Sequence, residues 1–408
     1  MIFLKKKFIN YFIISIFFII GSIIAINRGS NFSDGDSFSV ILSFLSYFEN
    51  GIYSPSRGAI GHPIPEFFIG TLSYLLGTPY SNFFCFITFF FSILFFFRAF
   101  INEQEKILLF FLLILSNFFL FIENTNSIDY PIALFFFSLG LFFLKKNKVI
   151  MSSIFFGLAI ASRANFLIFI YPIIFINFFE DVFNKKFTKF ITSLVITTLV
   201  GIIFYYPLFK INNFTLGFLD IPFLTQSDER AGWYGGPALT FESLFPRFIF
   251  KIYKIVGVFS VFLIILFSKE ILKKFNFKKK ENIFLLWVIF INLFIFFFMP
   301  TKMLIINPFL ICFYIIIFKY LNSKKIIFLI AFNFIQWFIS YDLIDIKYKH
   351  QEICFAKEAV SATFTFSIKK GEFINYIESE KNLSKCYSQF MGKYSNEFEK
   401  GIPLRLSN

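Results

Sequence analysis

The stretch from Leu4 to Asp36, "LKKKFINYFIISIFFIIGSIIAINRGSNFSDGD", decides the fold class. Three lysines, Lys5 to Lys7, precede an uninterrupted apolar run from Phe8 to Ile26. About 20 apolar residues suffice for a helix to cross a bilayer. The apolar run is long for a secretory signal, and no small-residue cleavage site follows it, so we interpret Phe8–Ile26 as the first membrane span. Because basic segments stay in the cytoplasm, the loop after this span is expected outside.

The composition places the whole chain in the same class. Of 408 residues, 57% are hydrophobic and 16% are charged, whereas a soluble domain carries roughly 25% charged residues. The 74 Phe residues are interpreted as bulk hydrophobes and not as aromatic cages. The net charge of +14 does not indicate a nucleic-acid partner, because the lysines cluster in short loops between apolar runs, the positive-inside pattern. These basic clusters are Lys5–Lys7, Lys145–Lys148, Lys185–Lys189, Lys273–Lys280 and Lys319–Lys325.

We therefore predict an all-α polytopic membrane protein with about 11 transmembrane helices, within a range of 11–13. Besides the first span, the predicted spans are 80–97, 106–122, 130–144, 149–162, 164–179, 188–209, 247–268, 283–299, 303–318 and 325–341. Pro65–Gly77 is apolar but too short to cross, so it is interpreted as a short or re-entrant helix. Ranges 149–162 and 164–179 could also form one long helix.

This topology divides the chain into a transmembrane domain, residues 1–341, and a small extracytoplasmic tail, residues 342–408. The first outer loop covers residues 27–79. Ser33 or Asp34 can cap an amphipathic helix there, and Gly51 can end it. In the tail, Cys354 and Cys386 could form a disulfide if the tail is outside.

The same topology gathers the unusual polar residues on the outer face. They are Asp34, Asp36, Arg57, His62, Glu66, Asp129, Arg163 and Lys302. Basic residues on that face run against the positive-inside trend, so Arg57, Arg163 and Lys302 call for another explanation. Simpler roles compete: an N-cap for Asp34, a snorkelling side chain for Lys302 and loop positioning for His62.

The chemistry of these residues suits transfer from a phosphate-linked donor. A carboxylate can be the general base that takes a proton from an acceptor, and a second one can bind the acceptor or a divalent cation. Arginine and lysine bind phosphate and can neutralise the charge that grows on a phosphate leaving group. No cofactor is firmly indicated; a divalent cation is compatible with the acidic pair, and no structural metal motif is present.

Several segments resemble the GT-C superfamily of membrane glycosyltransferases, which includes protein mannosyltransferases and aminoarabinose transferases. One span is followed by the acidic pair, an amphipathic stretch, "ENGIYSPSR" and "GHPIPEFF". Further along come "ENTNSIDYPIALFFFSLGLFFLKKNK", "IMSSIFFGLAIASRANFLIFIYP" and "MPTKMLIINPFL". The resemblance covers about residues 8–318.

The resemblance implies a GT-C fold in the inner (plasma) membrane with an active site on the extracytoplasmic side. It implies an inverting transfer of a sugar from a polyprenyl-phosphate-linked donor to a glycan, lipid or protein acceptor. Asp34 and Asp36 match the family's acidic motif, and either one can be the catalytic base. Substrate-binding roles fall to Arg57, His62, Glu66, Asp129, Arg163 and Lys302, of which Lys302 matches the phosphate-binding basic position.

Three other functions stay open at this point. A flippase or transporter of lipid-linked saccharides would carry ionisable residues near the middle of its spans, where this chain has almost none. A polymerase of lipid-linked saccharides would use basic residues in two outer loops without needing an acidic first loop. A non-catalytic envelope-assembly protein could share the fold.

Overall fold

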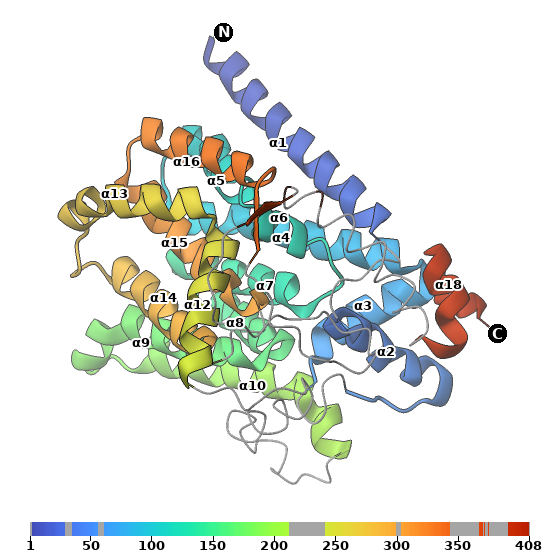
Figure 1. Ribbon diagram of the computed structural model, residues 1–408. Coiled ribbons are helices and arrows are strands. Elements are labelled where there is room, and N and C mark those ends of the chain that lie inside the picture. The colour runs from blue at the N-terminus through green and yellow to red at the C-terminus, as the bar shows by residue number, and fades with distance from the viewer. Residues whose placement is uncertain are drawn as a thin grey trace.

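A computed structural model describes residues 2–28, 35–55, 61–211, 241–298, 303–342, 367–369, 371, 374 and 391–407 (Figure 1). This part of the chain is helical apart from one short antiparallel pair of strands, β1 (Ser340–Asp342) and β2 (Ser367–Lys369). The all-α prediction is therefore correct for the bundle itself.

From α3 to α10, and again from α12 to α14, the helices follow one another with short connections. In the first half of the chain they are α1 (Ile2–Asn27), α2 (Gly35–Asn50), α3 (Pro63–Leu75), α4 (Thr78–Phe100), η1 (Gln104–Lys106), α5 (Ile107–Leu115), α6 (Phe118–Glu123), α7 (Asp129–Lys145), α8 (Val149–Ser162), η2 (Ala164–Phe166), α9 (Leu167–Phe183) and α10 (Thr188–Ile211). In the second half they are α12 (Phe241–Val256), α13 (Val258–Lys274), α14 (Lys280–Phe298), η4 (Met303–Ile306), α15 (Asn307–Tyr320), α16 (Ser323–Gln336), η5 (Gly392–Tyr394), α18 (Ser395–Lys400) and η6 (Leu404–Leu406).

Five helices in the described ranges are long and apolar enough to cross a membrane. They are Ile9–Asn27, Thr78–Phe100, Ala164–Phe183, Thr188–Ile211 and Lys280–Phe297, and two shorter apolar helices are Val149–Ser162 and Asn307–Tyr320. Many large apolar side chains of α1 and α10 are exposed, as on helices that face lipid. These features are compatible with a multi-pass membrane protein.

The chain reverses between α8 and α9, so the alternative of one long helix over 149–179 is wrong. Contacts of α10 with its two neighbours show their directions: the pairs are Ser153–Ser193 and Ile160–Tyr205 with α8, and Tyr171–Thr198 and Phe175–Phe190 with α9. Residue numbers rise together in the first two pairs and in opposite directions in the last two. Helix α8 is therefore parallel to α10, α9 is antiparallel to both, and the reversal falls at Arg163.

Two predicted spans are broken in the structure. The range 106–122 breaks at Ser116–Asn117, where the Asn117 side chain caps α6 by accepting a hydrogen bond from the Leu120 amide. The range 247–268 breaks at Gly257, whose φ of 89° strongly favours glycine. The last predicted span, 325–341, also ends early, at Gln336.

The two breaks lie side by side and are linked by a hydrogen bond. The side-chain amide nitrogen of Asn117 donates to the carbonyl of Ile255, two residues before Gly257, at 2.9 Å. It also donates to the hydroxyl of Tyr314 at 3.0 Å. Buried backbone groups must find partners where no water is available, so Asn117 compensates for hydrogen bonds that the breaks remove.

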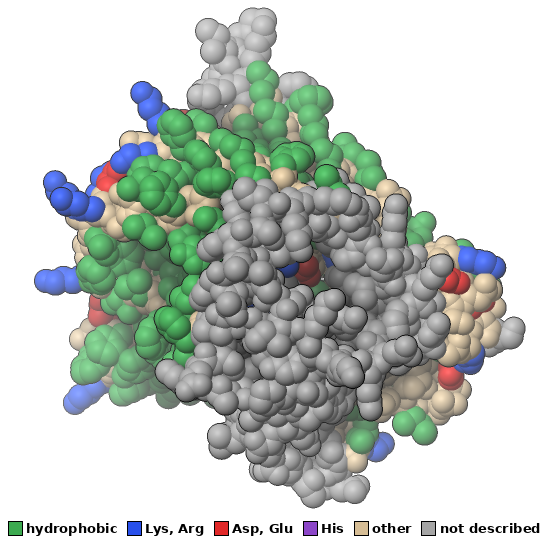
Figure 2. All heavy atoms as spheres, in the orientation of Figure 1, with side chains coloured by type: hydrophobic (Ala, Val, Ile, Leu, Met, Phe, Trp, Pro, Cys, Tyr) green, Lys and Arg blue, Asp and Glu red, His purple; other side chains and the backbone are tan. Residues whose placement is uncertain are grey.

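The lysine-rich loops lie at one end of the bundle, which we call the lysine end. Polar contacts connect its elements: Lys145–Asn102, Lys280–Glu180, Lys319–Glu281, Lys325–Glu270 and Lys274 with the carbonyl of Tyr320. Figure 2 shows basic side chains along the left edge of the molecule beside a broad hydrophobic area. The prediction that these loops share one side is confirmed for the lysines in the described ranges.

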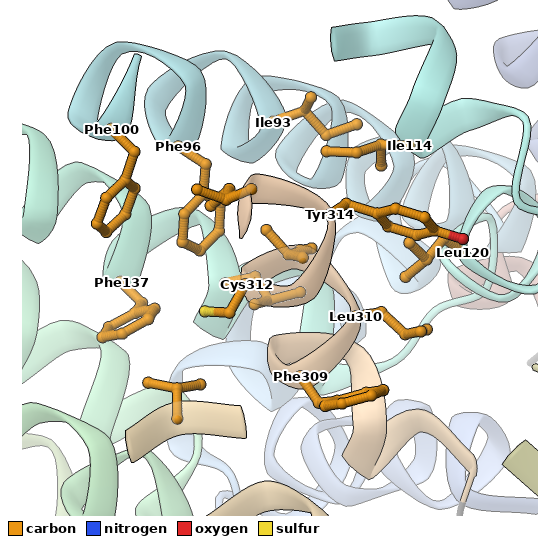
Figure 3. Packing of buried hydrophobic residues seen from close by; sticks show 14 of the residues in the cluster. Ile93, Phe96, Phe100, Ile114, Leu120, Phe137, Phe309, Leu310, Cys312 and Tyr314 are labelled. Atoms are coloured by element: carbon orange, nitrogen blue, oxygen red, sulfur yellow. The ribbon is translucent and has the colours of Figure 1, made fainter. Parts of the chain in front are cut away.

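The main core surrounds α15, which packs chiefly against α14 and also against α13 and α5. Figure 3 shows Phe96 of α4 and Phe137 of α7 on the side of α15 where Cys312 lies, and Leu310 and Tyr314 on the other side, near Leu120 of α6. The hydrophobic effect contributes little free energy to the association of helices that are embedded in lipid. Close van der Waals packing therefore has to hold such helices together. Gly157 allows such an approach between α8 and α10, because a Cβ there would lie 2.6 Å from the Cβ of Val200.

A second, smaller core joins the outer-loop helices to the C-terminal segment, residues 391–407. Its buried side chains include Val40, Ile41 and Leu45 of α2, Ile64 and Ile69 of α3, and Met391, Tyr394, Phe398 and Leu404. Two contacts with Glu49 of α2 add to it, an ion pair from Lys393 and a hydrogen bond from the Tyr394 hydroxyl. The predicted amphipathic helix ending at Gly51 is present, and the short helix predicted over Pro65–Gly77 is present as α3, Pro63–Leu75.

Candidate functional site

The structure describes four of the eight predicted site residues in full. Asp34, Arg57 and Lys302 lie outside the described residues, and for Asp36 only the backbone, at the start of α2, is described. The other four, His62, Glu66, Asp129 and Arg163, are all buried. They lie at the end of the bundle opposite the lysine end, where α3 and α7 begin and α8 ends.

Asp129 is the centre of this cluster. It is the first residue of α7, and its side chain is fully buried. One carboxylate oxygen, Oδ2, forms an ion pair with the guanidinium of Arg163 and lies 3.6 Å from Nε2 of His62. A carboxylate in the first turn is also stabilised by the helix dipole. These contacts bring together three segments that are far apart in the sequence.

Arg163 is held in a fixed orientation. The residue is extended between α8 and η2, with φ −160° and ψ 113°. Its guanidinium carbon lies 3.6 Å from the centre of the Tyr130 ring, within the range of a cation–π interaction. Pairing with Asp129 on one side and stacking on Tyr130 on the other compensates for the loss of water around a buried charge.

Glu66 connects α3 to the preceding loop. Its Oε1 accepts a hydrogen bond from the backbone amide of His62 at 2.7 Å, and its Oε2 accepts one from the hydroxyl of Tyr53. Burial, followed by the charge of Glu66, raises the pKa of Tyr53 well above its ordinary value, so this hydroxyl stays protonated and donates. Both oxygens of Glu66 therefore have protein donors, which favours a positioning role for Glu66 over the predicted substrate contact.

A chain of hydrogen bonds that we did not predict from the sequence fixes the loop before Asp129. The hydroxyl of Ser127 donates to Oδ1 of Asn82 at 2.6 Å, and Asn82 in turn donates to the carbonyl of Ala25. Arg28, at the end of α1, donates to the carbonyl of Ile122 at 2.8 Å. The run of short polar residues in "ENTNSID" is the only sequence signal for this anchoring, and it does not reveal the partners.

Positive charge beside the buried carboxylate comes from Arg163. Within the described ranges, no group of three His, Cys, Asp or Glu side chains is arranged to hold a metal ion. The divalent cation considered for the acidic pair concerns Asp34 and the side chain of Asp36, and so lies outside these ranges.

The geometry of this cluster suits the binding of a phosphate group. Nε2 of His62 lies 3.6 Å from Oδ2 of Asp129, and the buried carboxylate of Glu66 accepts a hydrogen bond from the His62 amide. The cluster therefore holds two buried carboxylates, and Arg163 provides a planar guanidinium in a site shielded from water. A guanidinium can bind two oxygens of a phosphate group.

No family model matches the chain, and no curated protein or solved structure matches it either. The function must therefore be argued from the site.

Proposed function

We propose that the protein is an integral-membrane glycosyltransferase with a GT-C fold and about 11 spans. It transfers a sugar from a polyprenyl-phosphate-linked donor to an envelope-glycan, lipid or protein acceptor on the extracytoplasmic face of the inner (plasma) membrane. The observation that carries the proposal is the buried cluster of Asp129, Arg163 and His62 at the end of the bundle opposite the lysines. By the positive-inside rule, that end faces outward.

The proposed reaction is a single displacement with inversion. The acceptor oxygen attacks the anomeric carbon of the donor sugar, and the bond from that carbon to the phosphate oxygen breaks. The acceptor proton passes to Asp34 or Asp36, and polyprenyl phosphate leaves with the bonding electrons. Arg57, Arg163 and Lys302 neutralise the leaving phosphate, while Asp129 holds Arg163 in place.

The position of α2 supports this assignment. The helix begins at Gly35, directly between the two aspartates, and its far end is held by Glu49 against the C-terminal segment. It packs against α3, whose first turn contains His62 and Glu66 next to the buried cluster. The acidic pair is therefore attached to an element that adjoins the cations.

The experiment measures release of polyprenyl phosphate from lipid-linked sugars by membranes that contain the protein. We expect Asp34→Asn or Asp36→Asn to abolish release while the protein accumulates normally. Glu103→Gln is the matched control, because Glu103 is an exposed carboxylate at the lysine end. Normal release by both aspartate variants would overturn the mechanism.

The helix breaks at Ser116–Asn117 and Gly257 favour a flippase of lipid-linked saccharides as the second candidate, since transporters often build their sites at discontinuous helices. Here the side-chain amide of Asn117 bridges the two breaks and closes the gap between them. Movement of intact lipid-linked sugar across sealed vesicles, without release of polyprenyl phosphate, would support the flippase.

A further inference from the structure

A cavity of about 340 Å³ lies at the lysine end, between the C-terminal ends of α4 and α7. Its lining residues are Arg98, Ile101, Asn102, Phe142, Lys145 and Lys146. The volume falls at the lower end of the range of roughly 300–1,000 Å³ for small-molecule sites. The cavity is therefore large enough for a lipid headgroup, and it lies at the opposite end of the bundle from the proposed active site.

The charge of the cavity is positive. Three of the six lining residues are cations and none is a carboxylate. The C-terminal ends of α4 and α7 each contribute about half a negative charge, so an excess of roughly two positive charges remains. Three converging cations without an acid among them indicate an anionic ligand.

The donors in the cavity are partly positioned. The ammonium of Lys145 donates to Oδ1 of Asn102 at 2.9 Å, which leaves the amide nitrogen of Asn102 and two further ammonium protons as donors. The ammonium of Lys146 lies 4.4 Å from the centre of the Phe142 ring. Arg98, in the last turn of α4, adds a planar guanidinium that suits two oxygens of one phosphate.

Carboxylates outside the cavity do not cancel this charge. Glu281 acts on Lys145, but it is ion-paired with Lys319 at 2.7 Å. Partial burial lowers the pKa of Lys145, Glu281 opposes this, and the neighbouring charge of Lys319 adds to it. A bound anion would relieve the unfavourable environment of Lys145.

We propose that this cavity binds the phosphate group of an anionic phospholipid from the leaflet at the lysine end. The apolar helix α4 ends at Phe100, so Ile101 and Asn102 lie where hydrocarbon gives way to headgroups. Basic pockets between transmembrane helices at this level bind anionic headgroups. Ile101 and Phe142 provide the apolar wall along which the glycerol and the first acyl carbons pack.

The test uses the full-length protein in detergent, with bound lipid counted by native mass spectrometry. Phosphatidylglycerol is compared with phosphatidylcholine, which carries no net charge. The variant R98Q/K145Q/K146Q removes the three cations. The matched control K185Q/K186Q/K189Q removes three lysines at the same end, two from the α9–α10 connection and one from the first turn of α10. The variant R98Q/K146Q keeps the contact between Lys145 and Asn102 and serves if the triple variant does not fold.

We expect wild type and the control to prefer phosphatidylglycerol, and the cavity triple variant to bind it about 100-fold more weakly, because each cation contributes roughly fivefold. The double variant should bind it at least about tenfold more weakly. Equal loss in the control, or equal binding of the two lipids by wild type, would overturn the proposal. Displacement of phosphatidylglycerol by a slight excess of inorganic phosphate would show that the cavity binds free phosphate, and would overturn the proposal that its ligand is a phospholipid.

Discussion

At the scale of single residues, the interaction that matters most is the ion pair between Asp129 and Arg163. Asp129 is fully buried and the Arg163 side chain is only 9% exposed. In that setting both charges have lost most of their water, and each depends on the other. The pair thus anchors the turn after α8 to the start of α7, and so positions the basic group that we assign to the donor phosphate.

We predict a strong energetic coupling between these two residues. Asp129→Asn and Arg163→Met should each lower the free energy of unfolding by about 3–5 kcal/mol, because each leaves one buried charge without its partner. The double variant should lose clearly less than the sum of the two. The measurement is a double-mutant cycle by denaturant titration in detergent.

An exposed ion pair in the same protein provides the control for this cycle. Glu103 and Lys106 at the lysine end are largely exposed, and removing either should cost at most about 1 kcal/mol. Additive and small effects at Asp129 and Arg163, similar to those at the exposed pair, would contradict the assignment of a buried, mutually dependent pair.

At the scale of elements, the bundle depends on how closely α8 approaches α10. The hydroxyl of Ser153 donates to Ser193, and Tyr205 donates to the carbonyl of Ile160 at 3.2 Å. Between these contacts, a Cβ on Gly157 would also lie 2.8 Å from the carbonyl oxygen of Thr197. Because this contact is with backbone, it cannot be relieved by rotating a side chain.

We predict that Gly157→Ala destabilises the protein by about 1–3 kcal/mol, the usual cost of overpacking. Gly201→Ala on the facing helix is the matched control, since a Cβ there would meet nothing closer than 3.4 Å. That substitution should be neutral or slightly stabilising, because alanine favours the helix. The midpoint of thermal unfolding in detergent measures the effect of each substitution on stability. Equal midpoints for the two variants would exclude close packing at Gly157.

At the scale of the whole molecule, the two ends of the bundle differ in character. The lysine-rich loops and their acidic partners gather at one end, and the buried cluster lies at the other, close to α2, α3 and the C-terminal segment. The difference in charge gives the molecule a direction across the membrane. It also separates the proposed lipid cavity from the proposed active site.

We predict that a membrane-impermeant thiol reagent reaches one end of the bundle in intact cells and the other end only after permeabilisation. Asn102→Cys and Asn147→Cys, both exposed at the lysine end, should be protected in intact cells and labelled after permeabilisation. Asn50→Cys, exposed at the end of α2, should be labelled in intact cells. The background carries Cys354→Ser and Cys386→Ser, and Cys85 and Cys312 can stay because they are buried. Labelling of position 102 in intact cells would reverse the topology.

Most helices could be predicted from the sequence, because an apolar run of sufficient length bounded by lysines has few alternatives in a bilayer. The breaks at Asn117 and Gly257 could not. Each interrupts a run long enough to be predicted as one span, and the two breaks are joined by distant contacts: Asn117 donates to Ile255 and Tyr314. Local composition carries no information about such partners.

The sequence by itself predicted that the chain is helical and apolar, that its lysine-rich loops share one side, and that Asp129, Arg163 and His62 belong to the other. These properties follow from hydropathy and charge, which each segment carries alone. Only the tertiary structure decided that Arg163 pairs with Asp129 and stacks on Tyr130, and that the oxygens of Glu66 are taken by His62 and Tyr53. Contacts between residues far apart in the chain depend on how helices pack, and packing depends on all of them at once.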